Sequence, residues 1–197
     1  MGSRYTLPHM ANLIIGFVGK PGCGKGTAAD VLRKQYGAGY CRFSAILNDI
    51  LSRLYVEKVR ENFAKLSEGL RKSFGEDVLS YAIEQETLRA PEEIVVVDGI
   101  RRVEDIIALE PLPQFKLIAI EASPEIRYER IKHRGERENE TNMTWEQFLA
   151  EEQLSTEVTI PAVMARARET VNNDGSPAEL EKRIHELMEG WGYTSIA

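Results

Sequence analysis

The chain has 197 residues, 43% of them hydrophobic and 28% charged, which is typical of one globular domain with a sizeable core. Its net charge of −6 argues against nucleic-acid binding through a general basic surface, and no apolar run reaches the length of a membrane-spanning helix. Two cysteines are too few for a metal-ligand set or a disulfide framework, which favours a reducing, cytoplasmic setting.

The first ten residues (MGSRYTLPHM) are polar and irregular, and they lack the apolar segment of a signal peptide. Gly-Ser near one end and His-Met at the other are typical of an expression-vector remnant. We therefore expect residues 1–10 to be a vector-derived or disordered tail, and residues 11–197 to form a single domain.

Strand-length apolar runs alternate with helical patterns along the rest of the chain. Uninterrupted apolar runs, which suit parallel strands covered on both faces, occupy 13–18, 94–98 and 116–121. Shorter strands are expected at 40–44 and around 171. Helical periodicity is expected over 27–36, nearly all of 45–90, 124–134, 144–154 and 177–189. This βαβ rhythm predicts a three-layer α/β fold.

Residues 19–27 (GKPGCGKGT) fit the pattern G-x-x-x-x-G-K with a hydroxyl residue shortly after, between a predicted strand and a predicted helix. Glycines allow consecutive backbone N–H groups to curl around a phosphate, and the helix dipole points at the same anion. Lys25 would reach the β- and γ-phosphates of a triphosphate. A merely flexible turn is the alternative, but every required residue is present. The predicted nucleotide-binding residues are Gly22, Cys23, Gly24, Lys25, Gly26 and Thr27.

Residues 21–27 (PGCGKGT) resemble the loop of the adenylate-kinase and nucleoside monophosphate kinase group, close to dephospho-CoA kinases and archaeal-type nucleotide kinases. The resemblance implies the P-loop kinase fold, with a five-stranded parallel sheet in the order 2-3-1-4-5. It also implies a helical acceptor-binding insertion at 45–90 and a short lid at 134–160. ATP and Mg²⁺ are the implied donor and cofactor.

One residue departs from the general P-loop pattern. The position after Lys25 holds Gly26, whereas Ser or Thr usually supplies a direct Mg²⁺ ligand there. We expect Thr27 to touch the α- or β-phosphate, with Mg²⁺ held largely through water. Thr27 and Asp98 are the candidate metal ligands.

The string Asp98-Gly99-Ile100-Arg101 follows a buried strand. A carboxylate at the C-terminal end of such a strand lies at the sheet edge where α/β proteins bind ligands. Asp98 could order Mg²⁺ waters or accept the acceptor hydroxyl's proton, and Arg101 could bind the acceptor's phosphate through both arms of its fork. The string resembles the corresponding segment of archaeal-type and deoxynucleotide kinases. A helix-capping aspartate followed by solvated arginines is the alternative, which we favour for Arg102.

Arg127, Arg130 and Arg134 fall on one face of a predicted helix. In the resembled kinases this segment leads into a lid whose arginines close over the transferring phosphoryl group and exclude water. That likeness assigns Arg130 to the nucleotide and a catalytic role to Arg134. A solvated, salt-bridged face is the alternative, because glutamates lie among these arginines.

Two further segments carry weaker predictions. In dephospho-CoA kinases and their relatives, a segment similar to residues 172–176 (NNDGS) lies against adenine, which implicates Asn173 and Gly175; a bare turn is the alternative. Arg71, before a predicted C-capping glycine, and Ser44, at the end of the second strand, are candidate acceptor ligands.

Together these patterns predict an ATP-dependent phosphotransferase with Lys25, Asp98 and Arg134 as its catalytic residues. The first-choice acceptor is a nucleoside monophosphate, and dephospho-CoA is the runner-up. A P-loop ATPase or nucleotide-dependent regulator of a protein or RNA partner is the alternative from another class. We expect a small-molecule partner, no membrane, no general nucleic-acid binding, and a monomer or small homo-oligomer.

Overall fold

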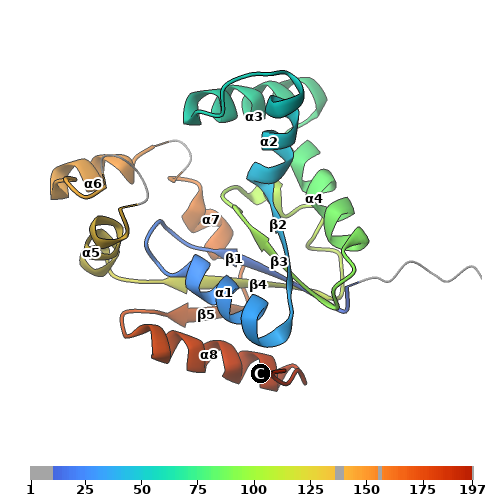
Figure 1. Ribbon diagram of the computed structural model, residues 1–197, viewed down its shortest axis with the longest axis vertical. Helices are drawn as coiled ribbons and strands as arrows, with labels where there is room; N and C mark the ends of the chain where they lie inside the picture. Colours follow the sequence, from blue (N-terminus) through green and yellow to red (C-terminus); the bar gives the residue numbers. More distant parts are fainter. Residues whose placement is uncertain (1–10, 136–139, 155–156, 197) are drawn as a thin grey trace, which may run out of the picture.

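The computed structural model describes residues 11–135, 140–154 and 157–196, so the predicted tail and parts of the predicted lid lie outside the described residues. In the described part, five parallel strands form one sheet in the order β2-β3-β1-β4-β5, which confirms the predicted order (Figure 1). The strands are β1 (Leu13–Val18), β2 (Gly39–Arg42), β3 (Ile94–Asp98), β4 (Phe115–Glu121) and β5 (Glu169–Asn172).

Helices cover both faces of the sheet. They are α1 (Lys25–Tyr36), α2 (Phe43–Arg53), α3 (Arg60–Phe74), α4 (Val78–Arg89), α5 (Pro124–Arg134), α6 (Trp145–Glu151), α7 (Ile160–Met164) and α8 (Pro177–Gly190), with a 3₁₀ turn at Val103–Asp105. In Figure 1, α3 lies at the top with α2 below it, α4 lies at the right, α5 and α6 at the left, and α8 at the bottom. None of the helices in the described ranges is both long and apolar enough to cross a membrane.

Two apolar layers enclose the sheet. Leu13, Ile15 and Phe17 of β1 pack on one face with α1 and α8, while Ile14 and Val18 pack on the other with α2, α4 and α7. Because both faces of the strand are buried, its sequence is apolar throughout instead of alternating with polar residues.

The strand register brings the phosphate loop and Asp98 to the same edge. β1 pairs with β3 in parallel, with Leu13 opposite Ile94 and Gly16 opposite Val97. The loop follows the carboxyl end of β1, and Asp98 is the last residue of β3. This is the edge at which open parallel sheets bind their ligands.

Near β2 the structure differs from the sequence prediction. The strand ends at Arg42 and α2 begins at Phe43, so Ser44 lies exposed in the first turn of a helix and not at a strand end. Phe43 and Leu47 explain the early switch, because helical spacing lets both side chains reach the core. The predicted helical block 45–90 contains the rest of α2, α3 and α4.

The short helix α7 was not predicted. It has five residues with proline in its first turn, and it buries Ile160 and Val163 against the central strands. Two apolar residues in such a short stretch are too few to reveal helical periodicity in the sequence.

Candidate active site

The phosphate loop is packed so closely that only glycine fits at several of its positions, of which Gly22 and Gly24 are two. Gly22 and Gly24 have φ angles of +78° and +106°, in the region that L-residues rarely adopt. A Cβ on Gly22 would lie 2.7 Å from the carbonyl oxygen of Arg127, and one on Gly24 would overlap the side-chain amide of Asn173. The loop therefore takes its shape from α5 and from the turn between β5 and α8.

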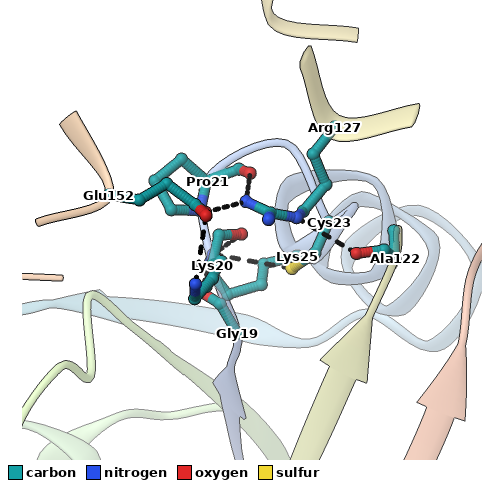
Figure 2. A network of polar contacts seen from close by, with 8 residues as sticks. All are labelled: Gly19, Lys20, Pro21, Cys23, Lys25, Ala122, Arg127 and Glu152. Atoms are coloured by element: carbon teal, nitrogen blue, oxygen red, sulfur yellow. Dashed lines mark hydrogen bonds and ion pairs between the residues drawn. The ribbon is translucent and has the colours of Figure 1, made fainter. Parts of the chain in front are cut away.

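Lys25 folds its side chain back over this loop. Its ammonium donates hydrogen bonds to the carbonyl oxygens of Gly19 (2.6 Å) and Lys20 (3.2 Å), and lies 3.7 Å from Cys23 Sγ (Figure 2). The charge is thus held against the loop at the N-terminus of α1, where the helix dipole adds to its attraction for anions.

Asp98 is held by side chains from β2. Its Oδ2 accepts a hydrogen bond of 2.7 Å from the Tyr40 hydroxyl and lies 3.5 Å from Arg42 Nε. Burial and the nearby Asp98 carboxylate both raise the pKa of Tyr40 well above its usual range, so the hydroxyl remains a donor. No helix of the described chain begins at Asp98, since the next turn starts at Val103, so helix capping does not explain this carboxylate.

Arg127 is buried, with a side chain only 3% exposed, and its partners were not predicted from the sequence. Its guanidinium donates to the carbonyl oxygens of Ala122 (3.0 Å) and Pro21 (3.4 Å), and to Glu152 Oε1 (2.5 Å). The other carboxylate oxygen of Glu152 accepts from Lys20 Nζ at 3.2 Å (Figure 2). Glu152, at the end of α6, therefore bridges the phosphate loop and α5.

The pKa of Glu152 reflects this bridge. Burial disfavours its charged form, but hydrogen bonds and charges from Arg127 and Lys20 outweigh that effect and hold the carboxyl pKa below its usual range. Nothing local in the sequence could have paired residues that are 25 and 132 positions apart.

The predicted base-binding residues converge on the phosphate loop. Arg130 donates to the carbonyl oxygens of Asn173 and Gly175, each at 2.8 Å, and the Asn173 amide donates to the Cys23 carbonyl at 2.8 Å. Asp174 accepts the Ser123 backbone N–H at 2.6 Å, which lowers the pKa of its carboxyl. These contacts join α5, the phosphate loop and the turn after β5.

Arg134 and Arg101 each face a buried glutamate of the segment that follows α5. Arg134 Nη2 lies 2.6 Å from Glu140 Oε1, and Arg101 Nη1 lies 2.5 Å from Glu157 Oε1. Both glutamates are nearly inaccessible to solvent. The structure therefore places both predicted phosphate-binding arginines on carboxylates, which present the same paired oxygens as a phosphate.

Arg71 is buried next to the turn that follows β3. Its Nη2 is 2.6 Å from Asp105 Oδ1, and both residues are buried; the carbonyl of Glu76 accepts from its other arm. Asp105 also accepts the backbone N–H groups of Arg101 and Arg102. Arg71 thereby orders the turn after Asp98, and its contact with an acceptor stays a prediction.

A cavity of about 770 Å³ opens beside the loop, within the range of small-molecule sites. It lies between α7 and the carboxyl ends of β4 and β5, and Lys20, Arg127, Met164 and Thr170 are among its lining residues. Of the described residues around it, none is a predicted acceptor ligand.

A magnesium ion that arrives with a nucleotide fits the residues at this edge. Within the described ranges, no group of three or more His, Cys, Asp or Glu side chains could hold an ion by itself. Thr27 is exposed in the first turn of α1, and Asp98 presents a partly exposed carboxylate. Phosphate oxygens and water would have to complete the ligand set.

Comparisons with known proteins identify relatives along most of the chain. Residues 15–155 match the family model described as an AAA domain. The chain is 30% identical over 176 residues to a UPF0200 protein of Hyperthermus butylicus, covering 89% of this chain and 93% of that protein. It is 29% identical over 182 residues to a UPF0200 protein of Thermococcus gammatolerans, covering 90% and 94%.

Solved structures with a similar fold include two kinases. The shikimate kinase from Bacteroides thetaiotaomicron matches with a TM-score of 0.59 and 15% identity, covering 92% of this chain and 99% of that one. A gluconokinase from Sinorhizobium meliloti matches with a TM-score of 0.53 and 17% identity, covering 93% and 98%. At these identities the likeness is one of fold.

Proposed function

This chain belongs to the AAA domain family and to the UPF0200 proteins, and from that premise we propose that it is an ATP-dependent phosphotransferase. It moves the γ-phosphoryl group of ATP to a small acceptor, with a nucleoside monophosphate as the first choice. One observation carries the proposal: the glycine loop, Lys25 and Asp98 all lie at the same edge of the sheet. Kinases of small molecules share the fold, which supports nucleotide-dependent phosphotransfer in general.

In this reaction Lys25 would exchange the carbonyl oxygens of Gly19 and Lys20 for the β- and γ-phosphate oxygens. Asp98 would orient the attacking oxygen of the acceptor, which is a phosphate oxygen in a nucleoside monophosphate and a hydroxyl in dephospho-CoA. It would accept the proton of that oxygen, where the oxygen carries one, as it attacks the γ-phosphorus and ADP leaves. Magnesium, when bound with ATP, would neutralise charge on the phosphate oxygens. Arg130 would keep the turn at 173–175 in place against the base of ATP.

A phosphorylated acceptor is supported by the cations near Asp98. Arg42 and Arg101 are 53% and 41% exposed at the carboxyl edge of β2 and β3. Each guanidinium offers a planar fork suited to a phosphate, and α2, α3 and α4 supply a helical wall next to it.

ATP hydrolysis without an acceptor is the second candidate function. It is supported by the family match, because the matching model is described as an AAA domain and not as a kinase. The two functions differ in one measurable property, namely whether ADP release depends on an acceptor.

The test is to incubate the full chain with ATP and Mg²⁺, alone and with ribo- and deoxynucleoside monophosphates or dephospho-CoA, and to measure ADP and the phosphorylated product. We expect ADP release to depend on one of the nucleoside monophosphates. Lys25→Met should lower that rate at least about 100-fold while the protein stays folded. Lys34→Met, on the exposed last turn of α1, is the matched control and should keep the rate.

Equal ADP release with and without every acceptor would favour the ATPase. Product formed from dephospho-CoA alone would move the assignment to that acceptor. A well-folded Lys25→Met protein with wild-type turnover would overturn the role of the loop in catalysis.

A further inference from the structure

A tyrosine and an arginine contact Asp98 at the carboxyl edge of the sheet. Both come from β2, which pairs with β3 so that Arg42 is opposite Asp98 and Tyr40 is opposite Val96. The Tyr40 hydroxyl donates to Asp98 Oδ2 at 2.7 Å, and Arg42 Nε lies 3.5 Å from the same oxygen. One carboxylate oxygen therefore has two donors from the neighbouring strand.

Two cations lie close to the Tyr40 ring. The Arg33 guanidinium, from α1, lies 5.2 Å from the ring centroid, and that of Arg42 lies 5.7 Å from it. The ring also packs against the apolar layer formed with α1 and α8. Cation–π contacts and packing together leave the ring little freedom, which fixes where its hydroxyl points.

The second oxygen of Asp98 is in a different situation. Among the described residues, Oδ1 has no hydrogen-bond partner, and the side chain is 22% exposed at the edge beside the loop. With Oδ2 fixed, the plane of the carboxylate is fixed too, so Oδ1 keeps one direction.

We propose that Tyr40 is a positioning residue, which holds Asp98 Oδ2 so that Oδ1 faces the attacking oxygen of the acceptor. This inference rests on the proposed function, because it assigns Asp98 to the acceptor. Its physical basis is orientation: a small misplacement of a reacting group can lower the rate by about 100-fold without weakening the binding of the substrate.

The test removes the hydroxyl and nothing else. Tyr40→Phe keeps the ring next to Arg33 and Arg42, and we expect kcat for transfer to fall about 10- to 100-fold. The KM for ATP should stay within twofold, and the ratio of ATP hydrolysed to acceptor phosphorylated should rise, because water needs less orientation than the acceptor. The urea midpoint of unfolding should fall only by as much as the loss of one hydrogen bond allows, and the calorimetric affinity for a non-hydrolysable ATP analogue should remain that of wild type.

Tyr36→Phe is the matched control. Its hydroxyl also makes one side-chain hydrogen bond, of 2.6 Å to His185 Nδ1, but at the far end of α1 from Lys25. This variant should keep wild-type kcat and the wild-type ratio of transfer to hydrolysis.

A double variant shows whether Tyr40 acts through Asp98. In an Asp98→Asn background, Tyr40→Phe should cause no further loss of kcat, whereas an independent role would multiply the two losses. A crystal structure of Tyr40→Phe should show the Asp98 carboxylate rotated or in more than one orientation.

The outcomes separate this inference from the proposed function. If wild type transfers phosphoryl groups and Tyr40→Phe does so with kcat within twofold, the positioning role is wrong and the phosphotransferase stands. Independent losses in the double variant also overturn it. A wild-type chain that transfers to no acceptor overturns both proposals.

Discussion

Gly26 occupies the position where a P-loop usually carries a hydroxyl. The residue is exposed in the first turn of α1, and a Cβ placed on it would meet no atom within 4 Å. Gly24, two residues earlier, has a φ of +106°, and a Cβ there would overlap the Asn173 amide. The same substitution should therefore have opposite consequences at two glycines of one loop.

We expect Gly26→Ala to raise the free energy of unfolding by up to about 1 kcal/mol, because glycine is the less favourable residue in a helix. Gly24→Ala should lower it by at least about 2 kcal/mol, through the strained backbone and the displaced amide. Urea denaturation of both variants measures the difference. A Gly24→Ala protein as stable as wild type would contradict the packing of Asn173 on the loop.

Among the elements, the segment that follows α5 directs several carboxylates at cations of the phosphate loop, of α5 and of the turn after β3. Glu152, at the end of α6, holds Lys20 and Arg127. Two further pairs among the described residues are Glu140 with Arg134 and Glu157 with Arg101. A phosphate that reached Lys20 or Arg127 would have to displace Glu152, because the two anions use the same donors.

Glu152→Gln should therefore destabilise the protein in a pH-dependent way. At pH 7 we expect a loss of about 1–2 kcal/mol in the free energy of unfolding, since the buried Arg127 loses an ionised partner. The pKa of Glu152 is lowered in the folded state, so its contribution is complete above the unfolded-state pKa and disappears as the pH falls through the folded-state value. Wild type and variant should converge in acid.

Glu186→Gln is the control for this prediction. Its carboxylate pairs with Lys182 at 3.8 Å on the exposed face of α8, where such pairs contribute only about 0.3–0.5 kcal/mol. Denaturant unfolding from pH 7 to pH 3 measures both variants. A Glu152→Gln protein whose deficit stays constant down to pH 3 would show that the carboxylate charge is not the cause.

The elements themselves were largely predictable, because burial on both faces leaves a clear signal in the sequence. Ile94–Asp98 was predicted with its observed bounds, and the observed order of the five strands follows the predicted one. The end of β2 and the short α7 were missed, since at both places tertiary packing decides between helix and strand.

Residues of the candidate site were predictable where a local sequence motif contains them. They were not predictable where the site depends on contacts between residues far apart in the sequence. The glycine pattern at 19–27 predicted a tight loop between a strand and a helix, and the structure has that loop between β1 and α1; its contact with phosphate stays a prediction. Tyr40 gave no signal, because its contact with Asp98 depends on which strands are neighbours. Glu152 gave none either, because its two partners lie on different elements.

At the scale of the whole molecule, the candidate nucleotide site draws on segments from both halves of the chain. The loop comes from the N-terminal half, Arg130 from α5, and the turn at 173–175 from the last quarter. A ligand that binds all three should therefore stabilise the entire fold and not one part of it.

A non-hydrolysable ATP analogue should raise the melting temperature for this reason. At 100 times its Kd a ligand contributes about 2.7 kcal/mol, which for a chain of this size corresponds to roughly 5–10 °C. Differential scanning calorimetry with Mg²⁺ measures the shift, and adenosine at the same concentration, which lacks phosphates, should produce far less. Equal shifts for the two ligands would mean that the phosphates do not reach the loop.

The hydrogen bond between the Asn173 amide and the Cys23 carbonyl spans 150 residues, and it has a consequence for biosynthesis. The ribosome makes the glycine loop 150 residues before it reaches Asn173. A nascent chain can pair β1 with β3 and β4 early, but the loop lacks the side chain that packs on Gly24 until Asn173 has emerged. Translation that stops before β5 therefore releases a chain with its glycine motif intact and its loop unsupported, and we expect a nascent chain to acquire a fully packed loop only after Asn173 has been made.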